Sequence, residues 1–313
     1  MLEPTVPIGA TARTSPFLEV HSFNLLAMPP PHQVDINSNV RARKHTAETI
    51  PIKTVSFACP KCKRPLQPGE NALQCSECRL TYPIVGGIPD FLSEGQLVSA
   101  APNYRWIKML EFLAPIYEGQ LWHSFILKTL AGARSSSLDS ITDFVSDTLK
   151  GITGSVLDVA CGPATYGRRI ASSSRNVYGV DFSMGTLRQG MKNIARDGIS
   201  NIYLARTRVE ELPFENAVFD GVICGGSLHL FPDTVLALRE IARTMKAGAP
   251  LAVTTFVAGN APLTRLMKRR KNMRVFQIPD LWQYLAEAGF EGFDPKLDGT
   301  FLTFSARKAM PSK

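Results

Sequence analysis

The chain has 313 residues, 44% of them hydrophobic, and a formal net charge of +8 at pH 7. This length is enough for one sizeable core and a small satellite domain. No run of about 18 apolar residues occurs, so the sequence predicts no transmembrane helix. The positive charge suits nucleic acid, anionic lipid headgroups or an acidic substrate, and it does not choose among them.

Residues 1–55 show no clear hydrophobic periodicity, and prolines, including Pro29-Pro30-Pro31, break any long element. We expect a mostly disordered tail. It is poor in acidic residues and carries a basic patch at residues 41–44, so an organelle transit peptide is one interpretation. A flexible tail, or a chain that truly starts at Met28, are the others.

Residues 56–93 contain two C-x-x-C pairs, Cys59/Cys62 and Cys75/Cys78, separated by twelve residues. Each pair can turn two thiolates toward one point, and four sulfurs in a tetrahedron suit Zn²⁺. All four positions are sulfur, which leaves no open place for water and predicts a structural zinc ribbon. Surface thiols or two disulfides are the alternatives. Disulfide scaffolds are usually short and secreted, so a reducing compartment, the cytoplasm, is expected.

Residues 94–150 are expected to form a helical lid or linker. The stretch 103–131 is rich in aromatic residues and broadly helical, with a break near Pro115. Its aromatic side chains can cover a ligand or simply pack against the core. A loop at residues 135–137 and a helix over 138–149 lead into the next domain.

From residue 151 to 313, strand and helix patterns alternate. We predict strands at 155–159, 177–181, 201–205, 218–224, 250–256, about 290–295 and 300–307, and helices near 163–172, 184–196, 234–246 and 279–288. This alternation predicts an α/β fold with a doubly wound, mostly parallel seven-stranded sheet. The last two strands should form an antiparallel hairpin around Asp298-Gly299.

Residues 156–181 form the most informative unit of the sequence. An apolar strand carries Asp158, a turn of small residues follows at 160–164, and a second short strand ends in Asp181. Such a strand–turn–helix–strand unit holds a nucleoside, because the turn lets backbone N–H groups approach the ligand and the second acid accepts hydrogen bonds from ribose hydroxyls.

At residues 157–164, LDVACGPA, the chain resembles the class I S-adenosylmethionine (SAM)-dependent methyltransferases. Alanine stands at two positions, 160 and 164, where the family motif has glycine. The segments EELPF (210–214), FDGVI (219–223), LHLFPD (228–233) and the stretch 238–249 resemble the branch with ubiquinone and menaquinone methyltransferases. Residues 80–89 resemble the zinc ribbon of tRNA methyltransferase activator subunits.

The resemblance implies a SAM site at the carboxyl ends of the strands. Asp158 should hold the methionine part, directly or through water; a helix-capping role is its alternative. Asp181 should bind the ribose, where the alternative is a turn aspartate. The remaining expected cofactor-binding residues come from the loops beside these strand ends: Ala160, Gly162, Ala164, Phe182, Met184, Val209, Glu210, Cys224 and Gly225.

Arg208 departs from the family, whose members usually have an aspartate there that accepts from the adenine amino group. Arginine has no acceptor, so Val209 and Glu210 are expected to do this work, or the adenine contacts are weaker, or Arg208 points outward. His229 is the candidate catalytic residue, as proton acceptor; a packed loop histidine is its alternative. The basic cluster at 268–274 either borders the substrate or is solvated surface.

Three functions fit these features. The first is a methyltransferase acting on a ring carbon or hydroxyl of a small molecule, possible also with peripheral membrane contact. The second is an rRNA or tRNA base methyltransferase that uses the ribbon and the basic cluster to bind RNA. The third is a non-catalytic module that retains the fold. Expected cofactors are SAM and structural zinc.

Overall fold

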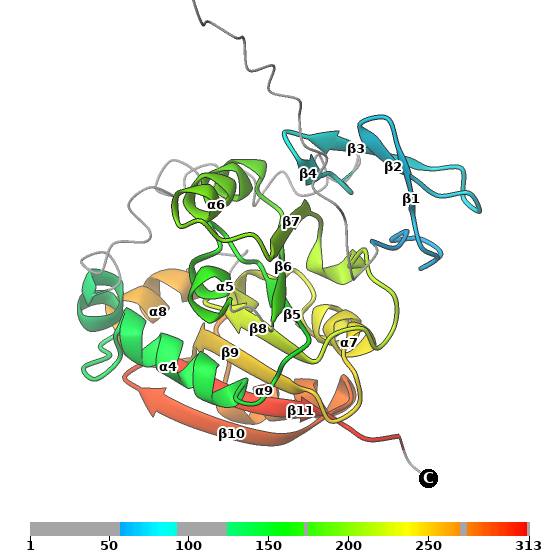
Figure 1. The fold of residues 1–313 in the computed structure, drawn as a ribbon. Helices are drawn as coiled ribbons and strands as arrows, with labels where there is room; N and C mark the ends of the chain where they lie inside the picture. The colour runs from blue at the N-terminus through cyan, green and yellow to red at the C-terminus, as the bar shows by residue number, and fades with distance from the viewer. Residues whose placement is uncertain (1–56, 93–123, 172–174, 270–273, 312–313) are drawn as a thin grey trace, which may run out of the picture. The chain divides into compact units, whose positions relative to one another are not determined.

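A computed structural model describes residues 57–92, 124–171, 175–269 and 274–311 (Figure 1). The predicted tail and most of the predicted lid therefore lie outside the described residues. All elements below belong to one compact unit, Pro51–Lys313. Among the described residues, no helix combines the length and apolar character needed to cross a bilayer.

The main sheet has seven strands in the order β10-β11-β9-β8-β5-β6-β7. Strands β7, β6, β5, β8 and β9 run parallel, and β11 is antiparallel to both β9 and β10. Chain order reverses between β5 and β8, where a doubly wound sheet opens to a ligand. The predicted fold is confirmed. The strands are β5 (Ser155–Val159), β6 (Asn176–Asp181), β7 (Ile202–Arg206), β8 (Gly221–Gly225), β9 (Pro250–Phe256), β10 (Phe290–Asp298) and β11 (Phe301–Lys308).

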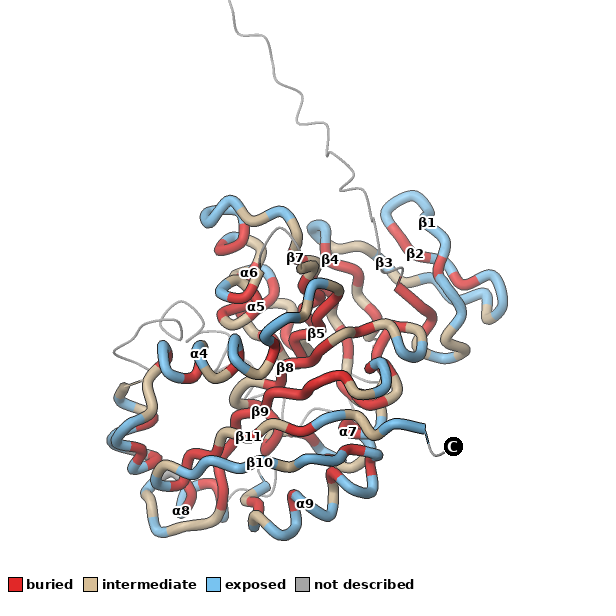
Figure 2. The backbone as a smooth tube through the Cα atoms, turned by 60° about the horizontal axis from the view of Figure 1, so that its bottom comes forward, coloured by how far each residue is buried: buried red, intermediate tan, exposed pale blue. Residues whose placement is uncertain are grey.

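Burial explains which strands lie at the centre of the sheet. Every residue of β5 and β9 is buried, as expected of parallel strands covered on both faces. The edge strand β10 is mostly exposed and carries Pro295 and Lys296, residues that discourage further strand pairing (Figure 2). The hairpin to β11 turns at Gly299, which has a positive φ of 63°.

Helices cover both faces of the sheet (Figure 1). Val145, Ile170 and Leu187, from α4, α5 and α6, pack in one apolar cluster, whereas Ile241 and Leu281, from α7 and α9, belong to the cluster on the other face. The helices are α4 (Leu138–Thr148), α5 (Thr165–Ile170), α6 (Met184–Arg196), α7 (Thr234–Thr244), α8 (Pro262–Lys268) and α9 (Ile278–Glu287).

The structure corrects several predicted boundaries. Helix α8 was not predicted; Pro262 at its first position starts it and Thr264 and Met267 are buried. Strand β8 begins three residues later than predicted, because Phe219 forms an isolated bridge with Met245 instead, and α7 ends at Thr244. Residues Phe125–Leu130 of the predicted lid form a short π-helix.

The ribbon is a four-stranded antiparallel sheet, with β1 (Gln67–Gly69), β2 (Ala72–Gln74), β3 (Thr81–Val85) and β4 (Ile88–Pro89). It packs against the main domain through aromatic rings: Phe57 lies 5.5 Å from Phe214 and 5.6 Å from Phe91, centroid to centroid. Backbone bonds continue the contact, since the Ala58 N–H donates to the Pro213 carbonyl. The ribbon and the main domain thus share one hydrophobic core.

Candidate cofactor and metal sites

The loop between β5 and α5 has an unusual backbone. Ala160, Gly162 and Ala164 all adopt positive φ, at 52°, 54° and 63°. An L-residue in this region costs about 1–2 kcal/mol, so the two alanines are strained where glycine would not be. The alternation of conformations turns successive N–H groups toward one side, as in anion-binding and ligand-binding loops. The family motif's glycines have a geometric reason here, and replacement by alanine is less neutral than size alone suggests.

Asp158 is a buried acid with one oxygen in use. Its side chain lies in the centre of the sheet at 1% exposure, and Oδ2 accepts from the Gly167 N–H at 3.1 Å. The other oxygen, Oδ1, is buried and has no hydrogen-bond partner among the described residues. Burial raises the pKa of Asp158 to about 7, against the lowering effect of the Gly167 bond. The capping alternative therefore describes one oxygen of Asp158. Oδ2 accepts from the first turn of α5, and Oδ1 is left as an acceptor for a ligand.

Asp181 ends β6 directly beside that loop. Oδ2 accepts from the Gly162 N–H at 2.9 Å, and Oδ1 accepts from the Ser183 N–H at 2.8 Å and the Thr186 hydroxyl at 3.3 Å. The carboxylate thereby links the loop after β5, residues 160–164 (the candidate cofactor loop), to the start of α6. The backbone donors fix the orientation of the carboxylate, and a rigid acceptor of hydrogen bonds from a diol requires such a fixed orientation.

Phe182 and Met184 follow Asp181 and are partly buried. The guanidinium of Arg206, at the end of β7, lies 5.8 Å from the Phe182 ring centroid, and its Nε donates to the Phe182 carbonyl at 2.9 Å. Sequence reasoning missed Arg206, whose only signal was its position at the end of the third parallel strand.

Past β7, Val209 begins a short 3₁₀ helix together with Glu210. The Arg208 Nε lies 3.5 Å from Oε2 of Glu210, so the arginine forms an ion pair with this nearby carboxylate. Oε1 of Glu210 is buried and has no hydrogen-bond partner within the described ranges. A second unsatisfied acceptor therefore lies past the end of β7, the strand that neighbours β6 and its Asp181.

Cys224 and Gly225 end β8, and Cys224 is buried. A Cβ on Gly225 would collide with the ring of Tyr166, so this ring lies directly against the end of β8. Tyr166 comes from α5 and packs against two clusters, one around the cofactor loop and one around Phe256. Glycine at 225 leaves the room that this ring occupies.

His229 is buried at 6% exposure beyond β8. Its Nδ1 lies 3.4 Å from the Thr255 hydroxyl, and its ring meets Phe256 edge-on at 5.2 Å. Burial lowers the pKa of His229 to about 4, so the ring is neutral at physiological pH. A neutral imidazole can accept a proton, and it also fits the packed-histidine alternative.

The four cysteines come together as predicted. Their sulfurs all lie within 4.8 Å of one another, and Sγ of Cys62 is 3.5 Å from Sγ of Cys75. A tetrahedral zinc site with Zn–S bonds of about 2.3 Å requires sulfurs about 3.8 Å apart, so these side chains fit a zinc ion. Four sulfurs complete its coordination, and the metal would act by holding the ribbon together.

Comparison with known proteins agrees with this architecture. Residues 156–248 match the methyltransferase domain family and residues 57–87 match the Trm112p-like protein family. An uncharacterised chloroplastic methyltransferase of Arabidopsis thaliana is 27% identical over 305 residues, covering 88% of this chain and 82% of that protein. Phosphoethanolamine N-methyltransferase 2 of Haemonchus contortus has a similar fold, with a TM-score of 0.52 at 15% identity, over 64% of this chain and 60% of that one.

The chain contains a SAM-dependent methyltransferase domain and a Trm112-like ribbon. The demethylmenaquinone methyltransferase of Listeria monocytogenes is 34% identical over 110 residues, which are 34% of this chain and 46% of that enzyme. The methyltransferase thus spans less than half the length of this relative.

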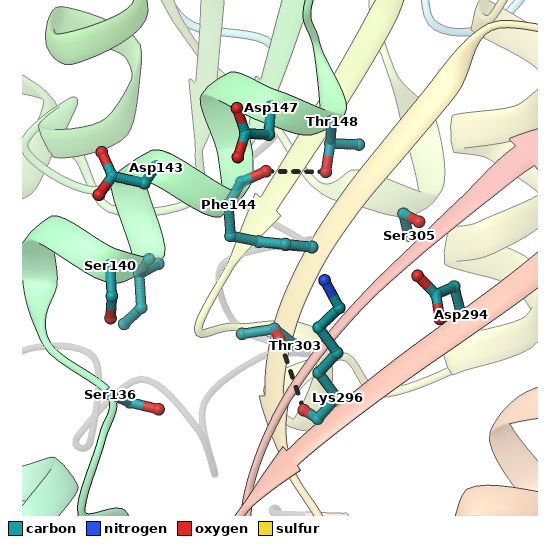
Figure 3. Close-up of a pocket in the computed structure, with 11 residues that line it drawn as sticks. Ser136, Ser140, Asp143, Phe144, Asp147, Thr148, Asp294, Lys296, Thr303 and Ser305 are labelled. Atoms are coloured by element: carbon teal, nitrogen blue, oxygen red, sulfur yellow. Dashed lines mark hydrogen bonds between the residues drawn. The ribbon is translucent and has the colours of Figure 1, made fainter.

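The methyltransferase also has an open groove of about 500 Å³ away from the predicted cofactor site. Helix α4 contributes Asp143, Phe144 and Asp147 to its lining, and β10 contributes Asp294 and Lys296 (Figure 3). Most of the lining side chains are polar or charged, and none of the predicted site residues lines it. The groove is therefore separate from the strand ends that carry the candidate cofactor residues.

Proposed function

We propose that this methyltransferase transfers the methyl group of SAM to a ring carbon or hydroxyl of a small molecule. The observation that carries the proposal is the pair of acids on adjacent parallel strands, β5 and β6. Among the described residues, Asp158 keeps a buried, unpartnered Oδ1, and Asp181 is fixed by one donor from the loop after β5 and two from the start of α6. A ligand with a cationic amino group and a ribose diol would donate hydrogen bonds to both carboxylates.

The roles of the surrounding residues follow from their positions. Asp158 Oδ1 would accept from the ammonium of the methionine part, while the loop of Ala160, Gly162 and Ala164 lies beneath it. Asp181 would bind the ribose hydroxyls. Phe182 and Met184 would lie beside the adenine.

Glu210 would replace the aspartate that Arg208 displaced. Its unpartnered Oε1 is an acceptor suited to the adenine amino group, and the Val209 N–H is a candidate donor to the ring. The Arg208 pair holds the other oxygen of Glu210 and limits the carboxylate's rotation.

On the acceptor side, SAM supplies an already activated methyl group, so the protein's task is to align the acceptor and exclude water. Tyr166 over Gly225 forms an apolar wall between the cofactor loop and the cluster around Phe256. Neutral His229 would accept the proton that a phenol, enol or ring carbon loses. The menaquinone methyltransferase relative supports an acceptor of quinol type.

Calorimetry with SAM tests the cofactor assignment. The protein should bind SAM, and Asp181→Ala should lose most of that binding, because charged hydrogen bonds contribute about 1.5–3 kcal/mol each. Asp294→Ala, which removes an exposed carboxylate from the edge strand, is the matched control and should bind as the wild type does. Unchanged binding by Asp181→Ala would refute the site.

Incubation with methyl-labelled SAM and a fractionated lysate tests the acceptor. Label in the organic extract, and methylation of a short-chain demethylmenaquinol, are expected. Label in RNA would favour the second candidate function, base methylation, which rests on the Trm112p-like ribbon and the exposed Arg265, Lys268 and Arg269 on and after α8. RNA binding would also weaken steeply with salt.

We also propose an organelle as this protein's location, on the basis of the chloroplastic relative and the basic, acid-poor patch near residues 41–44. Fusion of residues 1–55 to a fluorescent protein tests this location. Diffuse cytoplasmic fluorescence would restore the cytoplasmic expectation.

A further inference from the structure

Within the part of the chain that the structure describes, two ion pairs join the ribbon to the methyltransferase domain, and one of the two reaches the candidate cofactor site. Lys63 pairs with Glu240 on α7 at 2.7 Å. Asp90, directly after ribbon strand β4, pairs with Arg206 at the end of β7 at 3.1 Å. We propose that Arg206 is a positioning residue, through which the ribbon's Asp90 holds the ribose and adenine part of the site in its binding geometry. This inference rests on the proposed function.

The backbone places Arg206 between the ribbon and Asp181. Residues Asp90 and Arg206 form a parallel β-bridge, and the Phe91 N–H donates to the Arg206 carbonyl at 2.8 Å. On its other side, Arg206 is the register partner of Asp181 in the β6–β7 ladder. One residue therefore touches the last ribbon strand and the strand that ends in the ribose acid.

The side chain of Arg206 makes the same connection. Its Nη1 donates to Asp90, its Nε donates to the Phe182 carbonyl at 2.9 Å, and its guanidinium faces the Phe182 ring. Both partners of the ion pair are largely buried, at 12% exposure for Arg206 and 14% for Asp90. A planar group with donors on two edges can hold two elements at a fixed distance, which the single point charge of a lysine cannot do.

Removal of the Asp90 charge would leave a largely buried guanidinium without its counter-ion. Such a group seeks another partner or moves toward water. Either movement releases the Phe182 carbonyl and ring, which lie one residue past Asp181. The expected result is weaker binding of the nucleoside half of SAM, with the methionine half unaffected.

The experiment compares Asp90→Asn with Lys63→Met. Each variant removes one ribbon–domain ion pair, so each should lower the melting temperature. Asp90→Asn should weaken SAM binding about 3- to 10-fold in calorimetry, while Lys63→Met stays within about twofold of the wild type. The same loss should appear with 5′-methylthioadenosine, which keeps adenine and ribose but lacks the amino-acid end.

Two further variants separate positioning from general destabilisation. Arg206→Lys should reproduce the loss of affinity although it keeps the charge, and Asp90→Glu should recover affinity relative to Asp90→Asn. Equal SAM affinities for Asp90→Asn and Lys63→Met would overturn the inference, as would a loss confined to SAM and absent with 5′-methylthioadenosine.

Failure of the proposed function gives a different result. If the wild type does not bind SAM, or if Asp181→Ala binds it unchanged, both the site assignment and this inference are refuted. If Asp181→Ala loses binding and Asp90→Asn does not, only the role of Arg206 is refuted.

Discussion

Replacement of Asp158 by asparagine removes a charge from the most buried acid of the candidate site while keeping its shape. The amide oxygen of Asp158→Asn can still accept from the Gly167 N–H. The substitution removes the free-energy cost of burying an anion in the centre of the sheet. We therefore expect opposite effects on the stability of the ligand-free protein and on SAM affinity.

The magnitude follows from the pKa of Asp158, about 7 against an ordinary 3.8. This difference corresponds to about 4 kcal/mol. Because the folded protein has the higher pKa, it is most stable, with respect to this group, below pH 4, and it loses that stability as the pH rises from 4 through 7. Asp158→Asn should thus be up to about 4 kcal/mol more stable than the wild type at pH 8, and the difference should fall toward zero at pH 4.

The affinity for SAM should change in the opposite direction to the stability. An ionised Asp158 that meets an ammonium group contributes about 1.5–3 kcal/mol, so the variant should bind SAM about 10- to 150-fold more weakly at pH 7.5. In the wild type, affinity should also weaken about tenfold per pH unit below 7, because binding must first release a proton.

Urea unfolding at pH 5 and pH 8 measures the stability, and calorimetry in two buffers of different ionisation enthalpy measures affinity and proton release. Asp181→Ala serves as the control that loses affinity without relieving a buried charge. A variant that is less stable than the wild type at pH 8, or that binds SAM equally well, would refute the assignment of Asp158.

Three further predictions concern other parts of the chain. Removal of zinc by a chelator should lower the melting temperature of the whole unit by at least about 5 °C, because the ribbon packs on Phe214; reloading zinc should restore it, and a change confined to a separate early transition would contradict the shared core. Ala160→Gly should stabilise the protein by about 0.5 kcal/mol in urea unfolding, because it relieves a positive φ. Ala164→Gly should be close to neutral, because it also removes a buried methyl group. Destabilisation by Ala160→Gly would argue against backbone strain at residue 160. His229 has a pKa of about 4 in the fold, so the wild type should lose up to about 3 kcal/mol of stability from this group as the pH falls from 6.5 to 4, and His229→Gln should lack that loss; equal acid sensitivity of the two proteins would show that His229 is accessible to protons in the folded state.

The sequence predicted the elements whose signals are local. The seven strands of the main sheet and the helices α4, α5, α6, α7 and α9 were predicted because apolar runs and small-residue turns are contiguous in the chain. Their ends were less accurate, as at β8, because a long-range bridge between Phe219 and Met245 decides where that strand begins.

For the candidate site, the sequence placed Asp158 and Asp181 at the ends of adjacent strands through spacing alone. It could not give the state of these acids. The unpartnered oxygen of Asp158, its raised pKa and the three donors around Asp181 depend on which backbone groups the fold brings near. The ring of Tyr166 over Gly225 likewise comes from a contact between residues 59 positions apart.

The sequence by itself determined where the strands lie along the chain, the four clustered cysteines and the turn of small residues at 160–164, since each is a short run of residues with fixed spacing. Only the tertiary structure decided how the ribbon meets the domain. Asp90 and Arg206, or Lys63 and Glu240, are more than a hundred residues apart, and no periodicity relates them. Burial and charge pairing across a packed interface depend on the folded path of the chain, and those properties place Arg206 between the ribbon and Asp181.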